Sequence, residues 1–166
     1  MQFRFVHDFD VEPAGFWEMF FSEAFENELF RGLKMKTWKV LERRDEASKL
    51  HRTVKLEPDM AVPSWATSVV KETGYTEIDV FHKAESKMDV KIDPAVMRDR
   101  FQLSGVFAVT PLGPGRCRRE FSGEIKVSVP LLGGKIEKFM IDQIRDGYDQ
   151  AARITRDYLA KQKSQS

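Results

Sequence analysis

The chain has 166 residues, of which 42% are hydrophobic, and its 27 lysines and arginines nearly balance its 26 aspartates and glutamates. This length and composition favour one domain with a hydrophobic core, and a net charge of +1 gives no global field that would attract nucleic acid or an anionic membrane. The single cysteine, Cys117, excludes an intrachain disulfide, and with three scattered histidines it offers no zinc-ligand spacing, so we expect no metal and no cofactor.

The start of the sequence and its hydropathy favour a cytoplasmic protein. Charged residues occur within the first stretch, MQFRFVHDFD, which is too early for a signal peptide, and the chain contains no run of about 18 apolar residues. We therefore expect no stable membrane insertion. We also expect a single domain over residues 1–166, with a polar tail from about residue 162 that is frayed.

The first 32 residues predict a strand followed by two short helices. Phenylalanines alternate with polar residues in residues 2–8, as in a strand. Pro13 suits a first helical turn, and aromatic residues then recur at helical spacing as far as Gly32, with a break near Ser22. Core packing is the simplest role for these aromatic residues. The alternative is a flexible lid over a pocket.

The middle of the chain predicts five strands. Residues 34–44 and 50–56 alternate as the two arms of a hairpin. Residues 63–73 have helical spacing and stop at Gly74, which predicts a short helix or an irregular crossover. Three more alternating stretches then occur, at residues 76–84, 87–93 and 101–109.

The last part of the chain predicts a strand, a turn and one long helix. Apolar and polar residues alternate in REFSGEIKVSVP, which begins at Arg119. Pro130 ends this strand, and the Gly133-Gly134 pair is predicted to supply the unusual dihedral angles of a sharp turn. From Lys135 to about Lys161, apolar residues recur every three or four positions, which indicates a helix with one apolar face.

This order of elements predicts an antiparallel meander that buries one face beneath the long helix. The turn PLLGGKIEKFM, the strand before it and the amphipathic helix after it resemble the C-terminal signature of the helix-grip (SRPBCC) superfamily, which includes START lipid-transfer domains, polyketide cyclases and the birch-pollen allergen. The similarity is greatest to an uncharacterised bacterial branch. It implies an α+β helix-grip fold: a curved antiparallel sheet of about seven strands, two short helices after the first strand, and a long C-terminal helix across the sheet. It also implies an internal apolar cavity between sheet and helix.

The strand and helix patterns predict which side chains line that cavity, although each could instead be ordinary packed core. The predicted ligand-binding residues are Trp38, Val40, Arg52, Val54, Ile78, Val80, His82, Val90, Phe101, Leu103, Phe107, Ile125, Val127, Met140, Ile144 and Tyr148. Two arginines are in phase with this apolar set, Arg52 and Arg119. An inward arginine must meet a carboxylate, a polar ligand head group or water. The alternative is that both lie near strand ends and reach solvent.

The sequence contains no GxSxG, HExxH, phosphate-loop or paired-cysteine motif, and we predict no catalytic residue. A cyclase of the superfamily type would need a proton-transfer group in the pocket, for which His82 and Tyr148 are suitable by residue type. Positive neighbours of Cys117 could lower its pKa, but an inert structural thiol is the simpler interpretation. Arginines near residues 43 and 116 could form a basic rim for phosphate head groups, or simply lie in solvent.

The leading hypothesis is non-enzymatic binding or transport of a lipid or other apolar small molecule. The alternative is a polyketide cyclase or dehydratase-like enzyme that uses the same pocket. A third possibility is an interaction module with a solid core and an exposed apolar patch.

Overall fold

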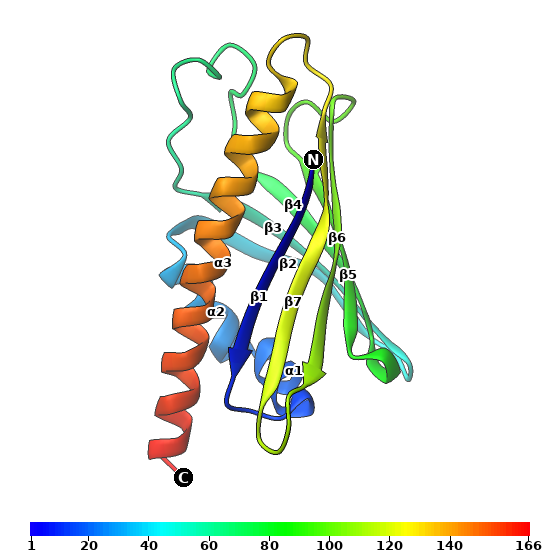
Figure 1. Ribbon diagram of the computed structural model, residues 1–166, viewed down its shortest axis with the longest axis vertical. Coiled ribbons are helices and arrows are strands. Elements are labelled where there is room, and N and C mark those ends of the chain that lie inside the picture. Colours follow the sequence, from blue (N-terminus) through cyan, green and yellow to red (C-terminus); the bar gives the residue numbers. More distant parts are fainter.

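The computed structural model describes residues 1–166, which form one antiparallel sheet, three α-helices and a short 3₁₀ turn (Figure 1). In chain order the elements are β1 (Gln2–Phe9), α1 (Pro13–Phe20), α2 (Glu23–Gly32), β2 (Met35–Asp45), β3 (Lys49–Pro58), β4 (Tyr75–His82), η1 (Lys83–Glu85), β5 (Lys87–Pro94), β6 (Phe101–Pro111), β7 (Cys117–Val127) and α3 (Gly133–Ser164).

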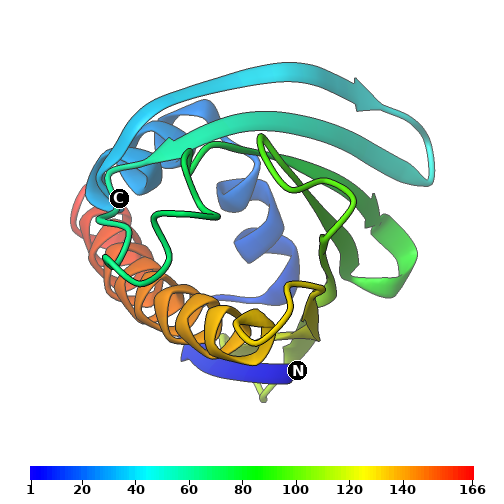
Figure 2. The same cartoon turned by 90° about the horizontal axis from the view of Figure 1, so that it is seen from above.

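The sheet has the order β1-β7-β6-β5-β4-β3-β2, and all its pairs are antiparallel. Strands β2 to β7 therefore pair in sequence order, and the last strand, β7, also pairs with the first, β1. Seen from above, the sheet curves around an interior and α3 lies along its open side (Figure 2). This is the predicted helix-grip fold.

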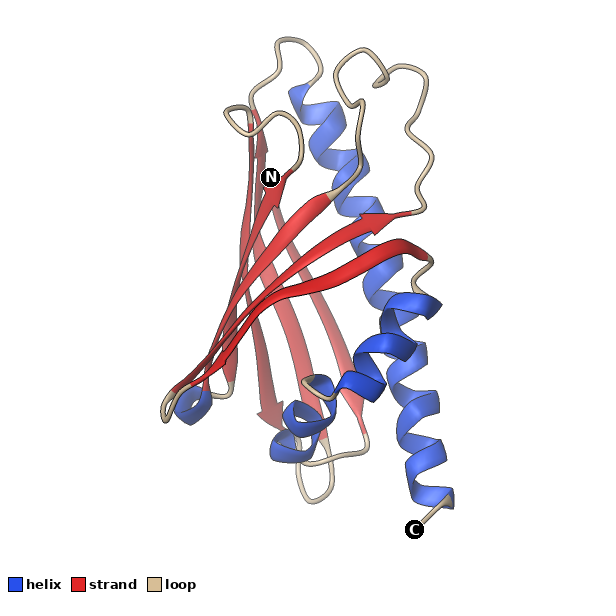
Figure 3. Ribbon diagram, turned by 180° about the vertical axis from the view of Figure 1, so that it is seen from behind, coloured by secondary structure: helices blue, strands red, loops and turns tan.

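The two ends of the grip differ. One end, which we call the helical end, holds α1 and α2, whereas the other, the loop end, holds the connections at residues 59–74, 95–100 and 128–132 (Figure 3). The two predicted short helices are present, and the hydroxyl of Ser22 between them accepts a hydrogen bond from the Phe25 amide as the N-cap of α2. Residues 59–74 form turns without a regular helix, in line with the predicted irregular crossover.

The aromatic residues of α1 and α2 pack in the core at the helical end, as the simplest interpretation predicted. The Trp17 ring lies 4.3 Å from Phe81 and 5.5 Å from Phe107, between ring centroids. Phe16 and Phe25 are each only 1% exposed. Clusters of this kind combine a large buried apolar area with favourable ring geometry, so this end of the interior is filled.

The predicted orientation of β4 is wrong. Asp79 and Phe81 are buried, whereas Ile78 is 37% exposed; Val80 and His82 share the outer face with Ile78. The register explains this, because Arg52 pairs with Asp79 and directly paired residues point to the same side of a sheet. The inner face of β4 therefore carries acidic residues, which an apolar pattern does not reveal.

The edge strand β2 also departs from prediction. Val40 pairs with the fully buried Val54 but is itself 40% exposed, because no strand covers the free edge of β2. A register shift follows between Val40 and Glu42, and such a bulge turns the side chains beyond it to the opposite face. As a result Arg43 points inward and donates to the carbonyl of Phe21 over 2.7 Å.

The turn before α3 works differently from the prediction. Leu131 adopts the left-handed conformation, with φ of 64°, whereas Gly133 and Gly134 are the first residues of the helix. Gly133 is required by space, since a Cβ atom there would lie 2.3 Å from the carbonyl oxygen of Val127. The helix continues to Ser164, into the segment expected to be frayed.

Candidate functional site

The inner surface of the grip is filled at the helical end and only partly filled at the loop end. Inward residues near α1, such as Phe107 and Cys117, are no more than 2% exposed. At the loop end and along the first half of α3, several inward side chains are only half-buried, namely Tyr75, Glu77, Ile92, Phe101, Met140 and Ile144, although Leu56, Val127 and Ile136 are buried there. Trp38 beside α2 and Tyr148 beside Arg119 are half-buried as well. Protein interiors are normally close-packed, so this difference marks the loop end as the candidate binding region.

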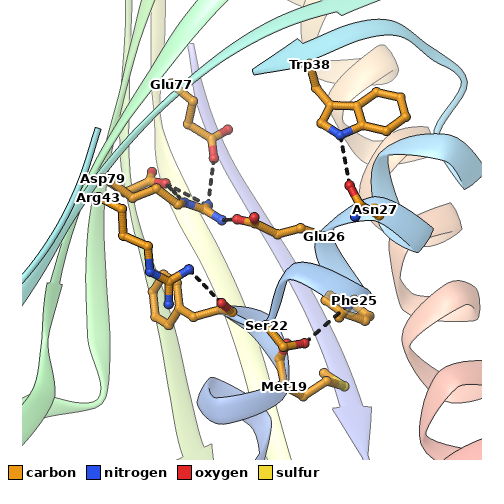
Figure 4. A network of polar contacts seen from close by, with 11 residues as sticks. Met19, Ser22, Phe25, Glu26, Asn27, Trp38, Arg43, Glu77 and Asp79 are labelled. Carbon is orange, nitrogen blue, oxygen red and sulfur yellow. Dashed lines mark hydrogen bonds and ion pairs between the residues drawn. The ribbon is translucent and has the colours of Figure 1, made fainter. Parts of the chain in front are cut away.

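A buried ionic cluster joins α2 to strands β3 and β4 (Figure 4). Arg52 on β3 is 2% exposed and donates to Asp79 Oδ2 from Nε over 2.9 Å and from Nη2 over 2.7 Å. Its Nη1 donates to Glu26 Oε1 of α2 over 2.5 Å, and Glu77 Oε1 lies 3.4 Å from Nη2. The requirement that an inward arginine meets carboxylates is confirmed here, and the alternative that Arg52 reaches solvent is wrong.

The cluster carries more acid than base, since three carboxylates surround one guanidinium. Phe20 and Phe21 lie against that guanidinium at 5.1 and 5.4 Å from their ring centroids and exclude water from it. Burial, and then the neighbouring Asp79, raises the pKa of Glu77 to about 8, and burial also raises the pKa of Asp79. The Oδ1 atom of Asp79 has no hydrogen-bond partner.

Glu77 is the accessible member of this cluster. Its side chain keeps 23% of its surface exposed, compared with 8% for Glu26 and none for Asp79. The register pairs Glu77 with Val54 and Ile92 on the inner face. The carboxyl group of Glu77 therefore faces the partly filled loop end rather than the solvent outside the sheet.

A second buried arginine, Arg119 on β7, lies in neutral surroundings. It is 3% exposed, its Nη2 donates to His7 Nδ1 over 2.9 Å and to the Tyr148 carbonyl over 3.1 Å, and its Nε has no partner. Burial lowers the pKa of Arg119 to about 10. Burial also lowers the pKa of His7, whose Nε2 lies 2.8 Å from Asp149 Oδ1. Arg119 thus meets no carboxylate directly.

A pocket of about 770 Å³ lies at the loop end, where the segment 59–74 meets the ends of strands β2 to β5. Leu56 and Tyr75 belong both to this pocket and to the inner face, while most of the remaining lining is polar or charged, including Lys55 and Asp93. None of the sixteen predicted ligand-binding residues lines it.

The predicted residues fall into three groups in the structure. Seven are buried on the inner face: Arg52, Val54, Val90, Leu103, Phe107, Ile125 and Val127. Five are half-buried there: Trp38, Phe101, Met140, Ile144 and Tyr148. Of the remaining four, Ile78, Val80 and His82 lie on the outer face, and Val40 shares the inner face with its partner Val54 but is exposed on the edge strand.

Sequence reasoning missed Glu26, Tyr75, Glu77 and Asp79. One signal was available, because Arg52 lies between Leu50 and Val54 in an inward pattern and so required an acidic partner. The alternating acidic residues of β4 were the nearest candidates. Their pattern was overlooked because the apolar residues of β4 alternate equally well in the opposite phase.

The catalytic candidates are weakened. His82 bonds to the exposed Asp89 on the outer face, with 2.8 Å between Nε2 and Oδ2, so it cannot reach the interior. Burial raises the pKa of Cys117 to about 11, which makes it an unreactive thiol. His, Cys, Asp and Glu side chains nowhere form a group suited to holding a metal ion.

The arginines of the predicted basic rim do not form one site: Arg44, Arg116 and Arg118 pair with acidic side chains, whereas Arg43 donates to a backbone carbonyl and Arg119 is buried. Arg118 donates to Asp8 over 2.8 Å, and Arg44 lies 2.8 Å from Glu46. The interpretation as solvated surface therefore fits better than a phosphate site.

None of the helices combines the length and the hydropathy that a membrane crossing requires.

Comparison with known proteins identifies a family for the chain but no curated relative. The family described as "Protein of unknown function (DUF2505)" matches residues 4–159. No curated protein matches the chain.

Several solved structures share the architecture. The Zhui aromatase/cyclase from Streptomyces sp. R1128 has a TM-score of 0.67 at 9% identity, over 95% of this chain and 92% of that one. A START superfamily protein from Mycobacterium smegmatis has a TM-score of 0.60 at 15% identity, over 95% and 98%. Norcoclaurine synthase from Thalictrum flavum, in complex with dopamine and hydroxybenzaldehyde, has a TM-score of 0.65 at 12% identity, over 93% and 86%. These likenesses confirm the START-like, helix-grip fold.

Proposed function

The chain belongs to the DUF2505 family, and on that premise we propose that it binds a lipid or another apolar small molecule at the loop end, between the sheet and α3, without converting it chemically. The cytoplasm is the compartment we propose for this activity.

One observation carries the proposal: apolar side chains that point into the grip at the loop end stay half-buried. Met140 and Ile144 lie one helical turn apart on α3, and Phe101 and Ile92 approach from the sheet. Because close packing would normally bury such residues, they indicate a space that a ligand can complete. Burying their remaining apolar surface would contribute about 25 cal/mol per Å².

Similar folds support this choice without identifying the ligand. The neighbours include a START superfamily protein and an enzyme solved with two small aromatic molecules. The third possibility, an interaction module, has less support, since exposed apolar residues of the outer face are isolated. Val6, Ile78 and Val106 pair across the sheet with Glu120, Lys91 and Asp89, respectively.

The test compares two substitutions of isoleucine by tryptophan. Ile144→Trp would fill the proposed space, whereas Ile78→Trp adds the same ring to the outer face. We expect Nile red to bind the wild type and Ile78→Trp equally, and Ile144→Trp at least about tenfold more weakly. Thermal stability of Ile144→Trp should change little, because the ring enters open space. In a packed core the same substitution would destabilise the protein by about 1–3 kcal/mol.

Native mass spectrometry of the purified wild type, followed by organic extraction, should release an apolar molecule. Absence of any bound molecule, together with a strongly destabilised Ile144→Trp, would show that the interior is solid and would end the proposal.

The cyclase alternative retains one favourable observation. Glu77 faces the interior and has a pKa near 8, at which a carboxyl group can both donate and accept protons near neutral pH. Tyr148 could only donate, since burial raises its pKa well above the usual value. Mass spectrometry of a poly-β-carbonyl compound incubated with wild type and with Glu77→Gln would detect such chemistry. Identical product levels in the two samples would exclude Glu77 as its acid or base.

A further inference from the structure

The carboxylates of the ionic cluster around Arg52 can accept hydrogen bonds from a further, positively charged donor. Three carboxylates, those of Glu26, Glu77 and Asp79, lie within 3.4 Å of a single guanidinium. A charge that is buried without sufficient compensation is costly. The cluster therefore favours any group that brings positive charge or donates a hydrogen bond.

A second observation, independent of the charge count, points the same way. Asp79 is 1% exposed, and while its Oδ2 accepts two bonds from Arg52, its Oδ1 has no partner. A buried acceptor without a donor costs about 1–3 kcal/mol. Within the chain, the carboxyl group of Glu77 hydrogen-bonds to Asp79 while it holds its proton.

Access to the cluster comes through Glu77. Its side chain is 23% exposed on the inner face, beside the half-buried Tyr75 and Ile92 of the loop end. Glu26 and Asp79 are buried against Arg52, and the guanidinium of Arg52 lies against the rings of Phe20 and Phe21. A ligand in the loop end would thus place its apolar body against α3 and its polar end at Glu77.

We propose that Glu77, supported by Asp79 and Arg52, forms the polar end of the binding site and recognises an amine, or more weakly a hydroxyl group, on an otherwise apolar ligand. The proposal rests on the proposed function. With a pKa of about 8, the Glu77 carboxyl group holds a proton at pH 7. A protonated amine would replace that proton, pair with the resulting carboxylate and donate hydrogen bonds at the same time. A carboxylate or phosphate head group would instead face three carboxylates and is disfavoured.

The test uses dodecylamine, 1-dodecanol and dodecanoate, which share a chain length and differ in the head group. Each is titrated below its critical micelle concentration against the purified full chain loaded with Nile red. We expect dodecylamine to displace the dye at a concentration at least about tenfold lower than dodecanoate, with 1-dodecanol between them. This comparison requires no variant, so it stands even if a substitution impairs folding.

Two variants then test whether Glu77 causes the preference for an amine head group. Glu77→Gln should weaken dodecylamine binding about tenfold and leave 1-dodecanol within about twofold. Glu124→Gln removes the same charge from the exposed outer face of β7 and should behave as the wild type. Equal binding of amine and carboxylate by the wild type, or unchanged amine binding by Glu77→Gln, would overturn the assignment of the polar end while the proposed function stands. If none of the three compounds displaces the dye and no apolar molecule is extracted, the proposed function fails and this inference fails with it.

Discussion

Arg52 and Arg119 are both buried on the inner face of the same sheet, yet the protein accommodates them in opposite ways. Burial alone would lower the pKa of Arg52, but three carboxylates, led by Asp79, raise it above the ordinary value. Arg119 lies against the rings of Phe9 and Tyr148, at 5.1 and 5.2 Å from their centroids, and bonds to neutral acceptors. Charge pairing stabilises the first arginine, whereas aromatic faces and backbone dipoles stabilise the second.

The difference matters for function because a cluster with more carboxylates than cations can bind a positively charged ligand group, whereas the neutral cage around Arg119 offers no such partner. The Arg119 cage ties β1, β7 and α3 together at the filled end of the grip. The Arg52 cluster adjoins the partly filled end through Glu77. The comparison therefore distinguishes a structural arginine from one that organises a candidate site.

The largest effect should come from removing Arg52. In Arg52→Met, the carboxylates of Glu26 and Asp79 remain buried without their cation, and we expect the free energy of unfolding to fall by about 3–5 kcal/mol. Urea denaturation at pH 7 measures it. Arg118→Met, which breaks an exposed pair with Asp8, is the control and should unfold at nearly the same urea concentration as the wild type, because solvent screens an exposed ion pair.

Removing Arg119 should have a smaller effect. Arg119→Met leaves behind only the His7 ring and the Tyr148 carbonyl as unpaired acceptors, so we expect a loss of about 1–2 kcal/mol. The same denaturation experiment gives the comparison directly. Equal losses for the two methionine variants would contradict the distinction between a charged cluster and a neutral cage.

Removing the Glu77 carboxyl group should stabilise the protein at high pH, in contrast to the two arginine substitutions, which destabilise it. Its folded pKa of about 8 lies above the ordinary value of 4.5, so its contribution is fully present below pH 4.5 and is lost as the pH rises through 8. Glu77→Gln cannot ionise and should be more stable than the wild type at pH 9 by more than about 1 kcal/mol, since each unit of a raised pKa corresponds to about 1.4 kcal/mol, with no difference at pH 4. A thermal melt at each pH tests this, with Glu124→Gln as the variant that should show no trend.

Much of the fold was predictable because alternation and turn residues are local signals. The strand β7 and the helix after it follow from period alone, as do the two short helices around Ser22. The start of α3 was not predictable in detail, since the space beside Gly133 is set by the carbonyl of Val127, a feature of the folded chain. A glycine pair reads equally well as a turn or as a close contact.

The site was less predictable than the fold, for a reason visible in β4. Ile78 and Val80 alternate with Glu77 and Asp79, and the apolar pair is the usual choice for the inner face. Pairing with Arg52 instead turns Glu77 and Asp79 inward, because a buried guanidinium without carboxylates would cost more free energy than the exposure of two aliphatic side chains. Only the register across β3 and β4 carries that information.

The smallest predicted effect tests the neutral cage through His7. Its folded pKa is lowered from 6.5, chiefly by burial, so its contribution to stability is fully present above pH 6.5 and is lost as the pH falls through the folded pKa. Protonation would direct an N–H group at Arg119, while Asp149 on the far side and the more distant Arg156 act in opposite senses. Because solvent screens this partly exposed site, the wild type should lose only a few tenths of a kcal/mol relative to His7→Gln between pH 7 and pH 5. Denaturation of both proteins at the two pH values measures the change. A relative gain on acidification would mean that the Asp149 carboxylate, rather than the arginine, controls this histidine, and the surroundings of Arg119 could then no longer be described as a neutral cage.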